Sequence, residues 1–239
     1  MGKYLKLFEN HADYVSYSGG MILPNVSHCI TENHVHYNPI LPPSRQYLTF
    51  DILSDGTITW KRNGGSSLAR TIYYSLDNGT NWEEISTSTS AGATINVETG
   101  DTLIFKGENT FYGDIADNDN YNYFGGTASF NVSGNILSLC YGDDFAEVIQ
   151  LPSVTSATYG HFAALFKNSK IVSAKNLVLP LDVTNNVDYT YYRTFDSCTD
   201  LVEIPSTLPC GAWYAYTFDN CTSLAETPPV PDWGIYECE

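Results

Sequence analysis

The sequence is poor in basic residues, in methionine and in long apolar runs. Only 11 Lys and Arg stand against 27 Asp and Glu in 239 residues, and the formal net charge is −16. A surface this acidic repels nucleic-acid phosphates and anionic lipid head groups. No apolar run approaches the length of a membrane span. The shortage of positive charge therefore argues against nucleic-acid partners and against binding to membranes.

A secretion signal and recognisable catalytic motifs are also missing. The stretch KYLKLFENHADYVSYSGG after Met1 has neither the apolar core nor the cleavage site of a signal peptide. We therefore expect synthesis in a cytoplasm without general secretory export. The six cysteines include no CxxC pair, which favours reduced thiols. No GxSxG, phosphate loop or HExxH motif is present. We expect no enzyme activity, no catalytic residues, no metal and no cofactor.

The chain instead has many aromatic and turn-forming residues, including 18 Tyr and 18 Gly, which favours a mainly β protein. Its first region, residues 1–43, is broken by Gly19-Gly20 and by prolines up to Pro42-Pro43. Such a segment cannot bury enough apolar surface alone to offset the entropy of ordering. We expect an extended arm that orders against a partner.

Residues 44–142 alternate between apolar and polar residues, as strands with one buried face do. QYLTFDIL and TITWK are predicted to pair across Asp55-Gly56, and RTIYYSL and WEEIS across Asn78-Gly79. ATINV with DTLIFKG, and TASFNV with NILSLCYG, complete eight short strands. The stretch GDIADNDNYNYFGG is predicted to be one long polar loop. The number and spacing of the strands indicate an immunoglobulin-like antiparallel β-sandwich.

Residues 143–239 contain a repeat, because FDSCTDL at 195–201 returns as FDNCTSL at 218–224. Tyr191, Phe195 and Cys198 share one face of a predicted short helix, which a short apolar stretch and a proline follow. Phe162 and Phe166 begin a degenerate copy in which Ser169 stands near the cysteine position. Helix, strand and proline in repetition predict a solenoid. Its expected core comprises Phe166, Phe195, Cys198, Leu201, Phe218, Cys221 and Leu224.

The repeated cysteines are interpreted as small hydrophobes in the solenoid interior. If that site is apolar, Cys→Ser should cost roughly 1–3 kcal/mol and Cys→Ala less. Residues 229–239 follow the last repeat without a recognisable cap. We expect a partner subunit or further repeats to cover that repeat, with 229–239 extended.

FDSCTDLVEIPSTLP and FDNCTSLAETPPVP resemble the BspA-like, bacterial surface-antigen type of leucine-rich repeat over residues 162–236. The copy number is low for that family, and the first copy lacks the Cys-Thr pair. YLTFDILSDGTITWK and INVETGDTLIFKG resemble a β-sandwich that precedes such repeats in virion proteins of crAss-like gut phages. ILPNVSHC and VHYNP resemble an N-terminal segment of those proteins. The resemblance implies a head- or tail-fibre component of the virion.

Several residues are candidates for contact with a ligand, since exposed aromatic side chains stack on sugars. Tyr121, Tyr123 and Phe124 lie in the predicted loop, and Trp213, Tyr214 and Tyr216 in the last repeat. For Tyr214 and Tyr216, a place in the solenoid core is the competing interpretation.

The motifs that suggest metal binding or a sialidase-type fold can also be explained by simple structural roles. His28, Cys29, Glu32, His34 and His36 are potential zinc ligands, but polar contacts to a partner explain them as well. Asp114, Asp117 and Asp119 offer oxygens for calcium or form a solvated loop. SLDNGTNW at 75–82 resembles the Asp-box of sialidase-type propellers, a structural hairpin without catalytic role. We expect Asp77 to stabilise a tight turn.

The sequence as a whole predicts a non-enzymatic virion protein made in the host cytoplasm. Its partners would be other virion proteins, through residues 1–43, copies of itself in a homo-oligomer such as a trimer, and a host-surface glycan or protein. A bacterial cell-surface adhesin and a polysaccharide-degrading enzyme are the alternatives.

Overall fold

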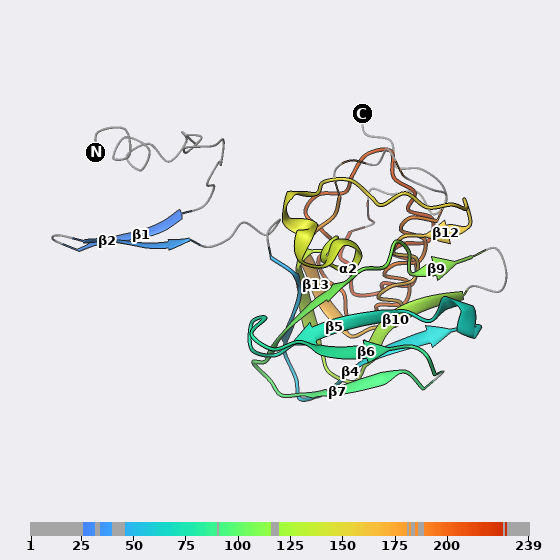
Figure 1. The fold of residues 1–239 in the computed structure, drawn as a ribbon, viewed down its shortest axis with the longest axis horizontal. Coiled ribbons are helices and arrows are strands. Elements are labelled where there is room, and N and C mark those ends of the chain that lie inside the picture. Colours follow the sequence, from blue (N-terminus) through green and yellow to red (C-terminus); the bar gives the residue numbers. More distant parts are fainter. Residues whose placement is uncertain are drawn as a thin grey trace. The chain divides into compact units, whose positions relative to one another are not determined.

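The computed structural model describes residues 26–31, 34–39, 46–89, 91–115, 120–180, 182, 185, 189–226 and 228, with only the backbone described for 26–39 and Ser66. The chain divides into two compact units, residues 1–42 and 43–239. Figure 1 shows the fold and labels many of its elements.

The first unit contains one antiparallel pair of strands, β1 (Val26–Thr31) and β2 (His34–Pro39). The register places His28 opposite Tyr37 and Cys29 opposite His36. The predicted zinc ligands His28, Cys29, His34 and His36 thus lie on paired strands, whereas Glu32 lies outside the described residues.

The second unit is mainly β and contains two sheets (Figure 1). One has the strand order β12-β9-β10-β4-β7, and the other β13-β11-β3-β8-β5-β6. Short helical segments lie at η2 (Ser66–Leu68), α2 (Ser138–Tyr141) and η3 (Gly142–Glu147). The strands are β3 (Leu48–Ile52), β4 (Gly56–Asn63), β5 (Thr71–Ser75), β6 (Glu83–Ser86), β7 (Ala93–Val97), β8 (Thr102–Gly107), β9 (Gly113–Asp114), β10 (Asn120–Gly126), β11 (Phe130–Asn135), β12 (Tyr159–Gly160) and β13 (Ile171–Val178).

Of the predicted hairpins, only β5–β6 is confirmed, with Thr71 opposite Ser86. The pairings of β3 with β4 and of β7 with β8 are wrong, because the members of each pair lie in different sheets. A tight turn can join two neighbouring strands of one sheet or connect strands of two different sheets. The alternation of apolar and polar residues is the same in both arrangements, so it does not identify the strand partner. The strand expected in NILSLCYG is also wrong, since that segment forms a turn and α2.

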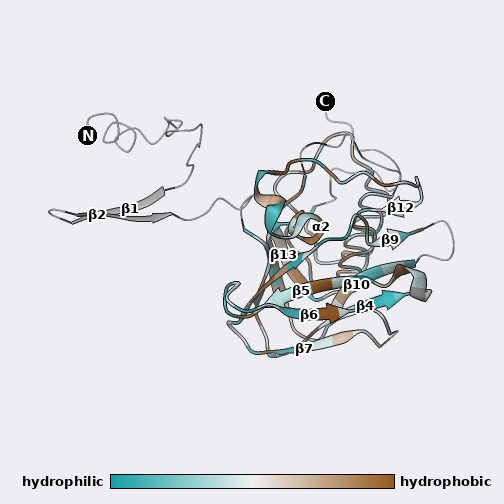
Figure 2. Ribbon diagram, in the orientation of Figure 1, coloured by the Kyte–Doolittle hydropathy of each residue, from teal (hydrophilic) through white to brown (hydrophobic). Residues whose placement is uncertain are grey.

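The inner faces of the two sheets share one apolar core. The ring of Phe50 on β3 lies 4.9 Å from that of Phe124 on β10, and Phe105 on β8 also lies 4.9 Å from Phe124. Trp60 on β4 contacts Phe124 at 4.7 Å. Figure 2 shows hydrophilic and hydrophobic parts within single strands such as β6. The alternation in the sequence therefore reports burial correctly even where it misassigns strand partners.

The repeats form consecutive turns at residues 163–168, 189–197 and 215–220, so the predicted short helices are wrong. We call residues 162–169, 191–198 and 214–221 the first, second and third coils. Backbone φ is positive at two equivalent positions in each coil, and positive φ interrupts an α-helix. Those residues are Ala164 and Asn168, Arg193 and Ser197, and Tyr216 and Asn220. Their four-residue spacing mimics a helical period in the sequence.

Alternate backbone N–H groups join each coil to the next. Four of the first coil, beginning with Phe162, donate to carbonyl oxygens of residues 190–196 at 2.8–2.9 Å. Four of the second, beginning with Tyr191, donate to those of residues 213–219 at 2.8–3.1 Å. The intervening N–H groups close turns within their own coil, as Leu165 does onto Phe162. An α-helix would use these donors internally and leave none for its neighbour.

Strands β13 and β12 connect the coil region to the two sheets. β13 pairs in parallel with β11, and Ser173 on β13 forms a further parallel bridge with Glu203 after the second coil. β12 pairs with β9 in the other sheet. The N–H of Phe124 donates to the carbonyl of Leu165 at 2.8 Å, so the first coil rests on β10. The sheets and the coils of residues 43–239 thus share one core.

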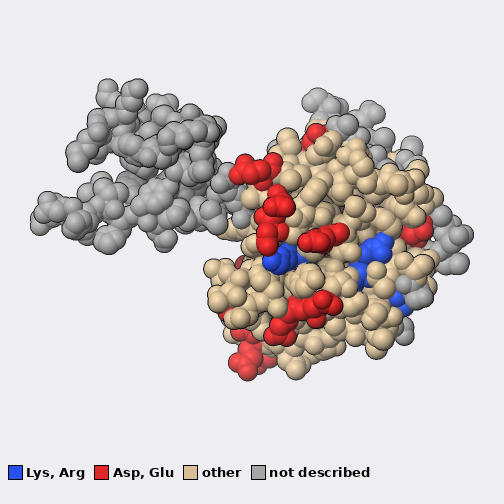
Figure 3. All heavy atoms as spheres, viewed as in Figure 1, with Lys and Arg blue, Asp and Glu red and all other residues tan. Residues whose placement is uncertain are grey.

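Acidic side chains spread over the face shown in Figure 3, whereas basic ones gather at a few places. No helix in the described part of the chain is long and apolar enough to cross a membrane.

Candidate binding surface on the stacked coils

Two columns of aromatic rings run through the coils. Phe166, Phe195 and Phe218 stack in succession at centroid distances of 5.3 and 5.4 Å. In the parallel column, Tyr191 stacks on Tyr214 at 4.9 Å. Six of the predicted core residues are buried, and the seventh, Leu224, is partly buried against the same cluster. The columns fix the coils face to face and so define which side chains point outward.

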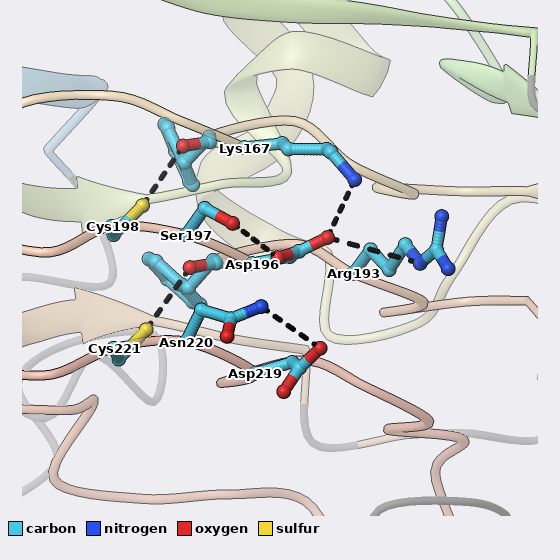
Figure 4. A network of polar contacts seen from close by, with 10 residues as sticks. Lys167, Arg193, Asp196, Ser197, Cys198, Asp219, Asn220 and Cys221 are labelled. Atoms are coloured by element: carbon cyan, nitrogen blue, oxygen red, sulfur yellow. Dashed lines mark hydrogen bonds and ion pairs between the residues drawn. The ribbon is translucent and has the colours of Figure 1, made fainter.

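The repeated cysteine is a hydrogen-bond donor. Cys198 Sγ donates to the carbonyl of Phe166 at 3.0 Å, and Cys221 Sγ to that of Phe195 at 3.1 Å, as the dashed lines in Figure 4 show. Ser169, at the equivalent position of the first coil, lies 3.4 Å from Cys198 Sγ. The interpretation of this site as apolar is therefore wrong, although both cysteines are free and buried as predicted.

A repeated threonine makes the same kind of contact one turn earlier. Thr194 Oγ1 donates to the carbonyl of Phe162 at 2.9 Å, and Thr217 Oγ1 lies 2.7 Å from that of Tyr191. Threonine and cysteine four residues apart thus bind each coil to the backbone of the preceding one. In the sequence this contact corresponds to the repeated TFxxC, at 194–198 and 217–221.

The thiols are not reactive groups. Burial raises the pKa of Cys198 to about 11 and that of Cys221 to about 12. Since the thiolate is the nucleophilic form, cysteines in such sites are chemically inert.

One side of the coils carries a buried carboxylate, shown in Figure 4. Asp196 is 4 % exposed and pairs with Lys167 Nζ of the first coil at 2.5 Å. The hydroxyl of Ser197 donates to its other oxygen at 2.7 Å, and Arg193 Nε lies 3.8 Å away. These partners hold the charge in place and orient the Arg193 side chain over the coils.

Two tyrosine rings lie against that arginine, and a third packs against one of them. The Arg193 guanidinium lies 5.1 Å from the ring centre of Tyr192 and 5.6 Å from that of Tyr216. Tyr192 meets Tyr189 and Tyr216 edge to face, at 5.5 and 6.0 Å. Tyr216 is 42 % exposed. We call Tyr189, Tyr192, Arg193 and Tyr216 the tyrosine–arginine surface. Aromatic faces and a planar donor side by side suit stacking on a polar ring and hydrogen bonding to it.

The structure places the predicted ligand-contacting residues differently. Phe124 is fully buried between the sheets, so its side chain belongs to the core. Tyr121 and Tyr123 lie on β10 rather than in a loop, partly exposed and with rings 5.5 Å apart. Trp213 is partly buried at the start of the third coil, and Tyr214 is core. Of the tyrosine–arginine surface, sequence analysis had singled out only Tyr216. The sequence did not indicate Tyr192 and Arg193, because the predicted helix directs these side chains differently from the observed turn with positive φ at Arg193.

The Asp-box motif forms the predicted turn. Asp77 accepts hydrogen bonds from the hydroxyl of Ser75 at 2.7 Å and from the backbone N–H of Asn81 at 2.8 Å. These bonds lower the pKa of Asp77 to about 2, the Asn81 N–H contributing most. The ring of Trp82 packs edge-on against Tyr47 at 5.1 Å. The motif is thus a structural one here.

Of the metal candidates, only Asp114 has a described side chain. Asp114 lies on β9, while Asp117 and Asp119 lie outside the described residues. The described part of the chain holds no group of three or more His, Cys, Asp or Glu side chains that would bind a metal ion.

Cys210 is disulfide-bonded, which corrects the expectation of reduced thiols for this position. Cys140, Cys198 and Cys221 are free.

Comparison with known proteins finds no relative. No protein-family model matches the chain, and neither a curated protein nor a solved structure matches it.

Proposed function

We propose that this chain is a structural virion protein whose tyrosine–arginine surface binds a glycan on the host cell. In this proposal residues 44–142 are an immunoglobulin-like sandwich, residues 143–239 a short solenoid of BspA-like leucine-rich repeats, and residues 1–43 the attachment arm. The protein would be a head- or tail-fibre component, assembled as a homo-oligomer such as a trimer.

The observation that carries the proposal is Arg193 held between the rings of Tyr192 and Tyr216 on a rigid backbone. Each coil is fixed by four hydrogen bonds to its neighbour, so these side chains need little ordering on binding. Sugar rings offer an apolar face for tyrosine and hydroxyl groups for an arginine. A preorganised aromatic and cationic surface on an acidic protein supports recognition of a polar, uncharged or acidic glycan.

A binding role suits this surface better than catalysis. The carboxylate of Asp196 is already engaged by Lys167 and Ser197. It is therefore occupied as a structural group rather than poised as an acid or base facing a substrate.

The division of the chain into two compact units, residues 1–42 and 43–239, supports the attachment role. A single two-stranded hairpin such as β1–β2 is marginally stable in water without further packing. A partner in the particle would supply that packing. Deleting residues 1–40 should leave the second unit folded and abolish incorporation into particles.

The test is the protein composition of phage particles purified by density gradient from a lysate of the host. Mass spectrometry should find the chain in the particle fraction at a fixed ratio to the capsid protein. Its absence there, with recovery in the bacterial envelope, would contradict the proposal and favour a cell-surface adhesin. Release of reducing ends from host polysaccharide by the purified chain would instead favour an enzyme.

A further inference from the structure

Asp219 is an exposed carboxylate in the same coil as Tyr216 of the tyrosine–arginine surface. It follows Tyr216 by three residues, and its backbone N–H donates to the Tyr216 carbonyl at 3.2 Å. In the second coil Asp196 stands in the same relation to Arg193, with a distance of 3.1 Å. The two aspartates thus occupy equivalent positions in successive coils, and Figure 4 shows both carboxylates turned away from the repeated cysteines.

The two aspartates have different partners, because the coils that precede them differ. Asp196 binds Lys167 of the first coil and the hydroxyl of Ser197, and it is 4 % exposed. The equivalent residue before Asp219 is Asp196 itself, an acid, and Asp219 forms no ion pair within the described residues. One oxygen of Asp219 accepts a hydrogen bond from the Asn220 amide at 3.1 Å. The other is left to accept hydrogen bonds from a ligand.

The charges at the tyrosine–arginine surface balance one another. Lys167 and Arg193 both face the carboxylate of Asp196, at 2.5 and 3.8 Å. Asp219 adds a second negative charge, so the charges of these four side chains sum to zero. The chain as a whole carries a formal net charge of −16. An anionic sugar would therefore meet no unpaired cation among these side chains, and the field of the protein would repel it.

We propose that Asp219 is the hydrogen-bond acceptor of the tyrosine–arginine surface and that its ligand is a neutral polysaccharide. The inference rests on the proposed glycan binding and narrows the class of glycan. A sugar hydroxyl both donates and accepts hydrogen bonds, so its recognition needs a donor and an acceptor. Arg193 supplies the donor, and Asp219 supplies a charged acceptor, which binds more strongly than a neutral one. Between them Tyr216, 42 % exposed, offers an aromatic face to the sugar ring.

Binding of the purified full chain to immobilised polysaccharides tests the ligand class. The neutral probes are a glucan, a mannan and a galactan, and the acidic probes are polygalacturonate and hyaluronate. The chain should bind at least one neutral probe about tenfold more tightly than either acidic probe, with an affinity that salt changes little. Tighter binding to an acidic probe would overturn the neutral class and leave glycan binding intact. Binding to none of the probes would contradict the proposed function as well.

An isosteric substitution tests the role of Asp219. Asp219→Asn should weaken binding to the preferred neutral probe at least about fivefold. It should also strengthen binding to polygalacturonate, because it removes a repelling charge. A variant that had merely lost its fold would weaken both. The matched control Glu84→Gln removes an exposed carboxylate from β6, outside the coils, and should change neither affinity more than about twofold. Unchanged neutral binding by Asp219→Asn, or an equal effect of both variants, would overturn the proposal.

Discussion

The role of Cys198 predicts an order of stability opposite to the one that a purely apolar site would give. Cys198→Ala removes the donor to the Phe166 carbonyl and leaves a small void where the sulfur was. The lost hydrogen bond costs about 0.5–1.5 kcal/mol net, and a void of this size costs about 1 kcal/mol. Cys198→Ser keeps a donor, as Ser169 does in the first coil, so it should cost less than about 1 kcal/mol.

Thermal unfolding followed by circular dichroism measures the difference. For a unit of this size, 1 kcal/mol shifts Tm by roughly 2–4 °C. Cys198→Ala should therefore lower Tm by roughly 3–10 °C and Cys198→Ser by less than about 4 °C. Cys140 is the matched control, since it is buried and its thiol makes no hydrogen bond within the described chain. There serine should be worse than alanine. A serine at 198 that is more destabilising than alanine would refute the donor role.

Three further changes test other parts of the fold. Phe195→Ala interrupts an aromatic column and should cost about 3–5 kcal/mol in urea unfolding, where less than about 1 kcal/mol would contradict the stacking. The hydrogen bonds to Asp77 lower its pKa to about 2, so their stabilisation is present above the unfolded pKa of about 3.9 and is lost as the pH falls toward 2. Asp77→Asn should flatten that part of the pH profile, and an unchanged profile would count against the turn. Burial lowers the pKa of His161, so stability should fall as the pH drops below the unfolded value of about 6.5. His161→Gln should remove this loss, and its persistence would assign it to another group.

Local patterns predicted the parts of the fold that local chemistry determines. Asn78-Gly79 between two alternating segments gave the β5–β6 hairpin, with φ of 57° and 86° at the two turn residues. The repeat identified buried residues such as Phe195 and Cys198, because an i, i+4 spacing selects one side in these turns as it does in a helix.

The remaining features depend on partners distant in sequence. β10 was expected to be loop because its Asn and Gly content is typical of turns, yet it pairs with β4 along six residues, from Tyr121 to Gly126. The buried amide of Asn122 is satisfied by Thr87 and by the Leu68 carbonyl, contacts that no local pattern reveals. The backbone conformation of the coils could not be predicted from the sequence either. Its positive φ falls on Arg193 and Tyr216, whose residue types give no such signal.

Competition for adsorption tests the proposed function most directly. Host cells are incubated with purified wild-type protein and then challenged with the phage, and unadsorbed particles are counted. The wild-type protein should reduce adsorption, and the double variant Arg193→Ala, Tyr216→Ala should not. The double variant Tyr121→Ala, Tyr123→Ala, which changes two partly exposed tyrosines on β10, should compete like the wild type. Equal competition by the wild-type protein and the Arg193→Ala, Tyr216→Ala variant would contradict a binding role for the tyrosine–arginine surface.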